Sequence, residues 1–141
     1  MTNSISITAD RPLDTTTGAV VPFVGRSLLA SIFILSGVAK LGDPAGTIGY
    51  IAATGLPLPE LGFVLAVAVE VIGGLLLVLG YRTRLVAAGL AAFSIATAVF
   101  FHSALGDQNQ FIHFFKNLAM AGGLLQVVAF GAGRFSLDAR R

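Results

Sequence analysis

The sequence predicts an all-α membrane protein, a four-helix transmembrane bundle with up-down-up-down topology and a short interfacial segment after the first helix. The 141 residues are 55% hydrophobic and only 11% charged, whereas soluble domains are about 25% charged. The mean hydropathy is +0.87. Four apolar runs, each close to the roughly 20 residues that cross a bilayer as a helix, alternate with polar segments. A chain of this length should form one membrane domain.

The chain begins with a polar, threonine-rich stretch over residues 1–19. No charged segment followed by an apolar run opens it, so we expect a flexible tail and no cleavable signal peptide. The first span covers residues 20–41 and is stopped by Gly42-Asp43-Pro44. Residues 43–60 are too short and too broken to span. Their apolar spacing indicates a short amphipathic helix lying at the membrane interface, with an irregular loop as the alternative.

The remaining spans follow with shorter connections. The second run, 61–81, leads through a tight turn at Arg82-Thr83-Arg84 into the third run, 85–105. These two spans should therefore be antiparallel neighbours. A polar loop leads to the fourth run, 111–130, and a glycine-rich tail closes the chain over residues 132–141. The predicted membrane domain thus extends over residues 20–131.

Basic residues are distributed unequally between the two ends of this bundle. Four spans place both termini and the turn between spans two and three on one side. That side carries seven arginines and the other two lysines: Arg11, Arg26, Arg82, Arg84, Arg134, Arg140 and Arg141 against Lys40 and Lys116. Because cytoplasmic segments are enriched in Lys and Arg, both termini should be cytoplasmic.

Composition also excludes several functions. The chain has no cysteine, so it forms no disulfides, thiolate metal sites or thiol redox centres of its own. No basic cluster interleaved with aromatic residues indicates nucleic-acid binding.

Glu70 is the first candidate for a functional role, because it lies at the centre of the second span. A carboxylate at that depth costs roughly 2.5–3.5 kcal/mol on insertion scales, and such residues usually face the bundle interior. Ala66, Gly73 and Gly74 lie on the same helical stripe. Small residues let a neighbouring helix approach closely, which places Glu70 on a packed face. The carboxylate either takes part in proton or ligand chemistry or forms a structural ion pair with Arg26.

The other candidates lie mainly in the half of the bundle remote from the termini. His102 should lie about one turn inside the third span, and His113, Lys116 and Asn117 in the first two turns of the fourth. Lys40 closes the first span. The two lysines are either cavity residues or side chains that extend toward water at helix ends. Two histidines can ligate haem or a metal, but no carboxylate lies at ligand spacing, so we predict no metal site and do not expect haem.

Several segments resemble the DoxX family of small four-helix bacterial membrane proteins, over nearly everything after the N-terminal tail. The similar segments are Gly25-Arg26-Ser27-Leu28, Ser36-Gly37-Val38-Ala39-Lys40-Leu41, Val69-Glu70-Val71-Ile72-Gly73-Gly74, Gly80-Tyr81-Arg82-Thr83-Arg84, Phe101-His102, Lys116-Asn117-Leu118-Ala119 and Gly131-Ala132-Gly133-Arg134-Phe135-Ser136-Leu137-Asp138. The resemblance implies a multi-pass protein of the bacterial inner membrane. It also implies a link to respiratory or oxidative-stress chemistry, since members are named as subunits of thiosulfate:quinone oxidoreductase or terminal quinol oxidase systems.

Together these observations predict a membrane subunit of an oxidoreductase system that holds a quinone or similar amphipathic ligand near Glu70. In this hypothesis Glu70 exchanges the proton, because quinone reduction couples electrons to protons. His102, His113, Lys116 and Asn117 contact the ligand, and Arg26 and Lys40 act electrostatically on Glu70. Expected partners are the bilayer, redox partner subunits and further copies of the chain. The alternatives are a small proton-coupled transporter and a non-catalytic assembly or scaffold protein.

Overall fold

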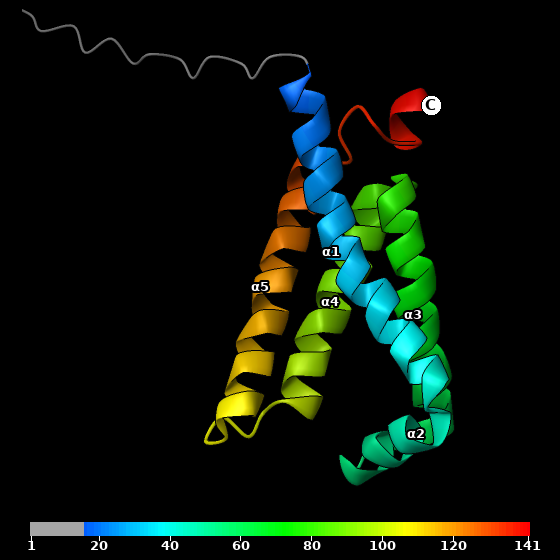
Figure 1. Cartoon of the computed structure of the whole chain (residues 1–141), viewed down its shortest axis with the longest axis vertical. Helices are drawn as coiled ribbons and strands as arrows, with labels where there is room; N and C mark the ends of the chain where they lie inside the picture. Colours follow the sequence, from blue (N-terminus) through cyan, green and yellow to red (C-terminus); the bar gives the residue numbers. More distant parts are fainter. Residues whose placement is uncertain (1–15) are drawn as a thin grey trace, which may run out of the picture.

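A computed structural model describes residues 16–141, which form five α-helices and a final 3-10 turn and contain no strand (Figure 1). The helices are α1 (Thr17–Gly42), α2 (Pro44–Ala53), α3 (Pro59–Leu79), α4 (Thr83–Phe101) and α5 (Gln108–Phe130), followed by the turn Asp138–Arg140. All except α2 are long and apolar enough to cross a membrane. The all-α, four-span prediction is therefore confirmed. Of the tail predicted at 1–19, residues 1–15 lie outside the described residues. Its last three residues belong to α1.

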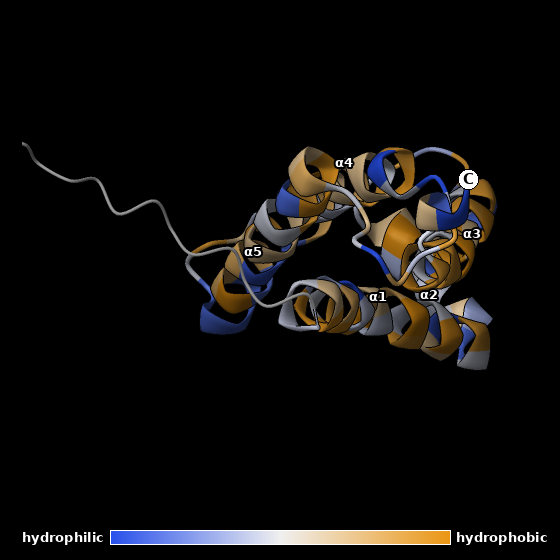
Figure 2. Ribbon diagram, turned by 90° about the horizontal axis from the view of Figure 1, so that it is seen from above, coloured by the Kyte–Doolittle hydropathy of each residue, from blue (hydrophilic) through white to orange (hydrophobic). Residues whose placement is uncertain are grey.

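The four long helices alternate in direction and associate as two close pairs, α1 with α3 and α4 with α5. The pairs meet through α3 and α4, whereas α1 and α5 contact each other little. Figure 1 shows the pairs diverging toward the end that carries α2 and the α4–α5 loop, and Figure 2 shows the same bundle from above. We call this the loop end and the opposite one the termini end.

Helix boundaries follow local capping chemistry. Asp43 accepts a hydrogen bond from the Gly46 N–H at 3.0 Å at the start of α2, and Asp107 accepts one from Gln110 at 2.9 Å at the start of α5. Short polar side chains at this position pair backbone N–H groups that have no partner within the helix. The predicted boundary of the third span at 105 is wrong, since α4 ends at Phe101. The predicted start of the fourth span at 111 is also wrong, since the Asp107 cap starts α5 three residues earlier.

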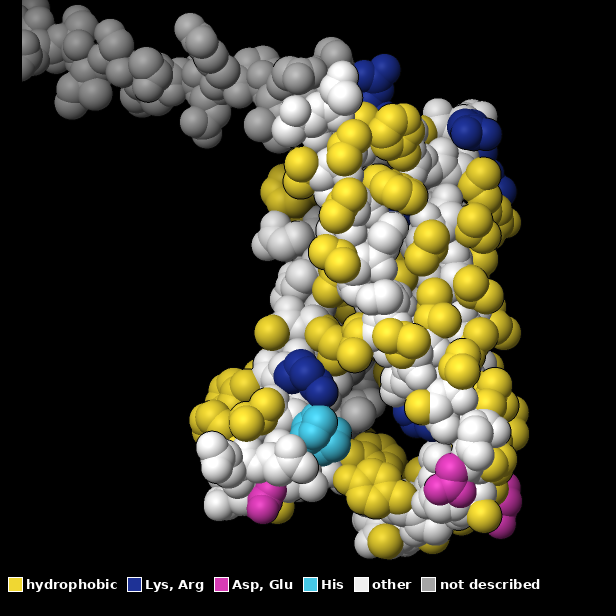
Figure 3. Space-filling model, viewed as in Figure 1, with side chains coloured by type: hydrophobic (Ala, Val, Ile, Leu, Met, Phe, Trp, Pro, Cys, Tyr) yellow, Lys and Arg dark blue, Asp and Glu magenta, His cyan; other side chains and the backbone are white. Residues whose placement is uncertain are grey.

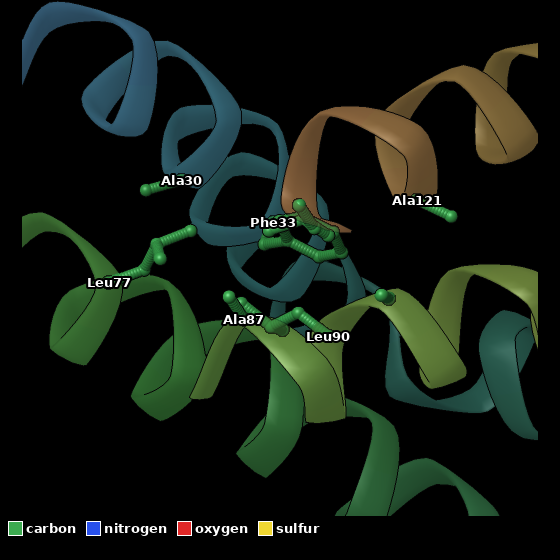
Figure 4. Close-up of a cluster of buried hydrophobic side chains, with 8 residues drawn as sticks. Ala30, Phe33, Leu77, Ala87, Leu90 and Ala121 are labelled. Carbon is green, nitrogen blue, oxygen red and sulfur yellow. The ribbon is translucent and has the colours of Figure 1, made fainter. Parts of the chain in front are cut away.

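The buried core lies where the two pairs meet (Figure 4) and includes Phe33, Leu77 and Leu90 together with several alanines. Small residues bring the helices close together. A Cβ added at Gly74 would lie 2.6 Å from Cγ1 of Ile34 on α1, which agrees with the packed stripe predicted around Glu70. Large apolar side chains cover the outside of the bundle (Figure 3), with Leu28 69% exposed. Such a surface suits hydrocarbon and is too apolar for water.

The C-terminal segment folds back onto the bundle, although the sequence predicts only a tail. The N–H of Leu137 donates to the Leu79 carbonyl at 3.1 Å, and that of Asp138 donates to Gly80 at 2.9 Å. Arg26, 1% exposed, donates to the carbonyls of Ala132, Val78 and Phe135. One buried guanidinium therefore joins α1, α3 and the C-terminal segment.

Asp138 caps α4 from a distance in sequence. Its carboxylate accepts from the N–H groups of Arg82 and Thr83, each at 2.8 Å, and from the Thr83 hydroxyl at 2.7 Å. The Thr83 N–H, then the Thr83 hydroxyl, are the main causes that lower the pKa of Asp138 below its usual value. The segment that the sequence predicts as a tail is thus part of the fold.

Replacing Asp138 by alanine should lower the free energy of unfolding by about 1 kcal/mol, as for other helix caps. Because the folded-state pKa is lowered, the capping contribution is present at neutral pH and is lost as the pH falls through the ordinary carboxyl range toward the lowered value. Thermal unfolding in mild detergent, followed by circular dichroism at pH 7 and in acid, measures both effects. Asp138→Asn keeps one acceptor and should be intermediate. An alanine variant with the same acid sensitivity as the wild type would contradict this assignment.

Candidate functional site

A cavity of about 570 Å³ opens between the two helix pairs at the loop end. Figure 3 shows this opening, with basic and histidine side chains on its α5 side. Ser36, Lys40 and Glu70 line the α1–α3 wall. His102, His113, Lys116 and Asn117 line the α4–α5 wall, and apolar residues such as Phe93 and Met120 lie between the two groups. The ligand-contacting residues predicted from the sequence therefore meet at one cavity, together with Glu70 and Lys40.

Glu70 lies on the α1–α3 wall, only 5% exposed. Its Oε1 atom accepts from Nζ of Lys40 at 2.9 Å and from the Ser36 hydroxyl at 3.0 Å. Lys40 also donates to Ser36 at 2.9 Å. The Oε2 atom of Glu70 is buried and has no hydrogen-bond partner among the described residues. One carboxylate oxygen is thus held in place while the other is left for another group.

The predicted ion pair between Arg26 and Glu70 is wrong. Arg26 lies toward the termini end and donates to backbone carbonyls there. The partner of Glu70 is Lys40, with Nζ 2.9 Å from Oε1. The reason is register, because α1 and α3 run antiparallel and the middle of α3 lies opposite the later turns of α1. Lys40 acts on Glu70 directly, as predicted, and Arg26 makes no such contact.

A glycine in α1 allows this contact. A Cβ at Gly37 would lie 3.1 Å from the Glu70 Cβ and 2.6 Å from Cγ2 of Val71. The glycine therefore lets α3 approach at the level of Glu70. Ser36 and Lys40, four residues apart, present their side chains on one face of α1 beside it. Ser36 was not among the predicted site residues, although its spacing of four residues from Lys40 could have indicated it.

The opposite wall carries a continuous polar group. Lys116 Nζ lies 2.9 Å from His113 Nδ1, and the rings of His113 and His102 stack with centroids 5.0 Å apart. His102 Nδ1 lies 2.9 Å from Oε1 of Gln110. Asn117 donates to the His113 carbonyl at 2.9 Å. His102 was predicted to lie about one turn inside the third span. It is instead the residue that follows α4. Among residues 16–141 no three histidines, aspartates or glutamates lie together as a metal site.

The helix α2 forms part of the cavity wall at the loop end. Its Tyr50 hydroxyl donates to the Phe101 carbonyl at 3.1 Å, and the two rings lie 5.6 Å apart. Ile51, 5% exposed, faces Gly62 of α3. The helical interpretation of residues 43–60 is therefore right for Pro44–Ala53, and the irregular loop is wrong. Tyr50 also lines the cavity, although it was not among the predicted site residues.

Comparison with known proteins agrees with this architecture. The chain is 36% identical to the Escherichia coli inner membrane protein YphA, over 86% of this chain and 90% of that protein. It is 37% identical to the Escherichia coli inner membrane protein YqjF, over 82% of this chain and 87% of that protein. No solved structure matches. The DoxX family profile matches residues 21–103, a range that includes most of α1, all of α3 and the Lys40–Glu70 pair between them. The chain is therefore a member of the DoxX family.

Proposed function

We propose that this chain is a membrane subunit of an oxidoreductase system and binds a quinone, or a similar amphipathic ligand, in the cavity beside Glu70. The observation that supports this most directly is that Glu70 lines the cavity while its buried Oε2 atom has no hydrogen-bond partner among the described residues. Buried polar atoms are nearly always hydrogen-bonded. A ligand hydroxyl, such as that of a quinol, would supply the missing donor.

The size and lining of the cavity fit such a ligand. Small-molecule pockets range over about 300–1,000 Å³ and are mostly apolar with a few placed polar groups, and this cavity measures about 570 Å³. Phe93 and Met120 offer apolar contacts to a ring, while Glu70 and Lys116 face the cavity from different helix pairs. A quinone, when bound, would supply the electron-accepting ring, and the protein supplies the hydrogen-bonding groups at its edges.

Proton handling falls to Glu70 in this proposal. Lys40 and Ser36 both bind Oε1. Oε2 is the oxygen that these contacts leave for the exchange of a proton with the ligand. Lys40 and Ser36 orient Glu70. Asn117 and the Lys116–His113 pair offer hydrogen bonds to the ligand from the opposite wall.

We further propose a bacterial inner membrane location with both termini in the cytoplasm. The relatives compared above are inner membrane proteins by name. Among the described residues, Arg82, Arg84 and the three arginines after α5 belong to the termini end. Lys40 and Lys116 lie toward the loop end. This asymmetry is the positive-inside pattern.

Glu70→Gln is expected to abolish ligand retention, because glutamine keeps the shape and loses the charge and the proton-accepting oxygen. The measurement is mass spectrometry of an organic extract from protein purified in mild detergent. We expect a stoichiometric quinone in the wild type and less than a tenth of it in the variant. Glu60→Gln makes the same change in the exposed first turn of the same helix and should retain the ligand.

Phospholipid alone in all three extracts would contradict quinone binding. Uptake assays in proteoliposomes would then separate the two alternatives. Uptake that depends on Glu70 would identify a proton-coupled carrier. Glu70-dependent assembly without uptake would identify a scaffold, in which the Lys40–Glu70 pair joins α1 to α3.

A further inference from the structure

Lys116 lies in a membrane-spanning helix and has no acidic partner. It comes eight residues after the start of α5 at Gln108, roughly 12 Å along the helix at 1.5 Å per residue. Its Nζ atom lies 2.9 Å from Nδ1 of His113, a side chain that carries no negative charge. The ion pair of the described residues is Lys40–Glu70, on the other wall. Charged groups inside a bilayer normally pair with one another or with a ligand.

The acids of the described residues are all accounted for elsewhere. They are Asp43 and Asp107, which cap α2 and α5, Asp138, which caps α4, Glu60 in the exposed first turn of α3, and Glu70, paired with Lys40. The helices α1, α4 and α5 contain no acid at all. No residue of the α4–α5 wall can therefore neutralise Lys116.

The charges that line the cavity are unevenly distributed between its two walls. On the α1–α3 wall the charges of Lys40 and Glu70 cancel at 2.9 Å. On the α4–α5 wall Lys116 remains, with His113 and His102 beside it. Asp43 also lines the cavity, from the start of α2, where its carboxylate caps that helix. The formal charges of the lining therefore balance overall, but Lys116 has no opposite charge on its own wall, which favours an opposite charge on whatever binds beside it.

The hydrogen bond between Lys116 and His113 also orients a second donor. A protonated Lys116 needs Nδ1 of His113 as its acceptor, which leaves the imidazole proton on Nε2. The α4–α5 wall thus offers an ammonium and an imidazole N–H to the cavity. A negatively charged oxygen makes shorter and stronger hydrogen bonds with such donors than a neutral oxygen does.

We propose that the ligand of this cavity carries an acidic head group and binds as an anion at Lys116 and His113, opposite the Lys40–Glu70 pair. The inference rests on the proposed binding of an amphipathic ligand and names its charge. Suitable groups are an acidic ring hydroxyl or a carboxylate on an apolar body.

Two matched probes test the charge. One is a naphthoquinone with a decyl chain and an acidic ring hydroxyl that is ionised at neutral pH, and the other is its neutral methyl ether. Dissociation constants for both are measured at one detergent concentration on wild type, Lys116→Gln, Lys116→Arg and Arg134→Gln. Arg134 is an exposed cation outside the cavity. Because partition into micelles is the same for every variant, the change in the ratio of the two constants is the readout.

We expect the wild type and Arg134→Gln to bind the anionic probe more tightly than its ether by about tenfold to a hundredfold, the range of one hydrogen bond to a charged group. Lys116→Gln should bring the ratio near one, and Lys116→Arg should restore most of it. Equal binding of both probes by the wild type would overturn the acidic ligand and leave quinone binding intact. A preference that survives in Lys116→Gln would overturn the site. Binding of neither probe would overturn the proposed function together with this inference.

Discussion

Replacing Arg26 by methionine is expected to lower the free energy of unfolding by about 5 kcal/mol. Hydrogen bonds to charged groups contribute about 1.5–3 kcal/mol each, and this guanidinium makes three, so the estimate takes the lower end of their sum. The side chain is 1% exposed, so water cannot replace it at the carbonyls of Val78, Ala132 and Phe135. Methionine fills much of the same volume but leaves these carbonyl oxygens without hydrogen bonds. Burying a polar group without a hydrogen bond is unfavourable.

The result should have a local signature. The residues after α5 are held through Ala132 and Phe135, and they in turn position Asp138 at the start of α4. Arg26→Met should therefore expose the C-terminal segment to proteases before the bundle melts. Thermal unfolding in mild detergent and limited proteolysis measure the two effects. Arg134→Met removes an exposed guanidinium from the same end and should be close to wild type. An Arg26→Met protein with unchanged melting and proteolysis would contradict this account.

Lys40→Leu should lower the free energy of unfolding by about 3 kcal/mol. Removal of one member of a buried ion pair leaves an uncompensated charge and costs about 3–5 kcal/mol. The lower end applies here because the Lys40 side chain is 26% exposed, against 6% for Glu70. Ser36 alone would remain as a hydrogen-bond partner of Glu70 among the described residues.

The double variant Lys40→Leu with Glu70→Leu provides the diagnostic comparison. Replacing a whole buried pair by apolar residues is often neutral or stabilising, so the double variant should recover most of the stability lost by Lys40→Leu. It should still fail to retain ligand, which separates the structural from the functional use of the pair. Unfolding in urea and ligand extraction on the same preparations give both values. If the double variant were as unstable as the single one, the pair would not be the source of the loss.

Much of this architecture follows from local patterns. The four spans are set by hydropathy and length, and α2 begins where Asp43 and Pro44 supply a cap and a favourable first residue. Glu70 was predictable as an inward residue because Gly73 and Gly74 share its face. The prediction that the cavity residues lie near one another followed from their similar depth in the membrane. These inferences use spacing along a single helix, which the sequence contains directly.

What the sequence did not reveal depends on contacts between distant segments. Arg26 was an equally reasonable partner for Glu70 by charge, and only the register of α1 against α3 selects Lys40. The cap on α4 comes from Asp138, more than fifty residues away in sequence. The stacking of His102 on His113 needs the end of α4 to lie beside the second turn of α5. Pairings of this kind are decided by tertiary packing.

The position of the core has a consequence for motion. Phe33, Leu77 and Leu90 pack where the helix pairs meet, and Arg26 ties the termini end to the C-terminal segment. Local opening needs least free energy where buried contacts are fewest. The amide protons of that closed half should therefore exchange slowest, while the pairs can separate at the loop end around a cavity. If the cavity binds an amphipathic ligand, as proposed above, we expect the ligand to enter from the bilayer by local opening of the loop end, without global unfolding of the other half.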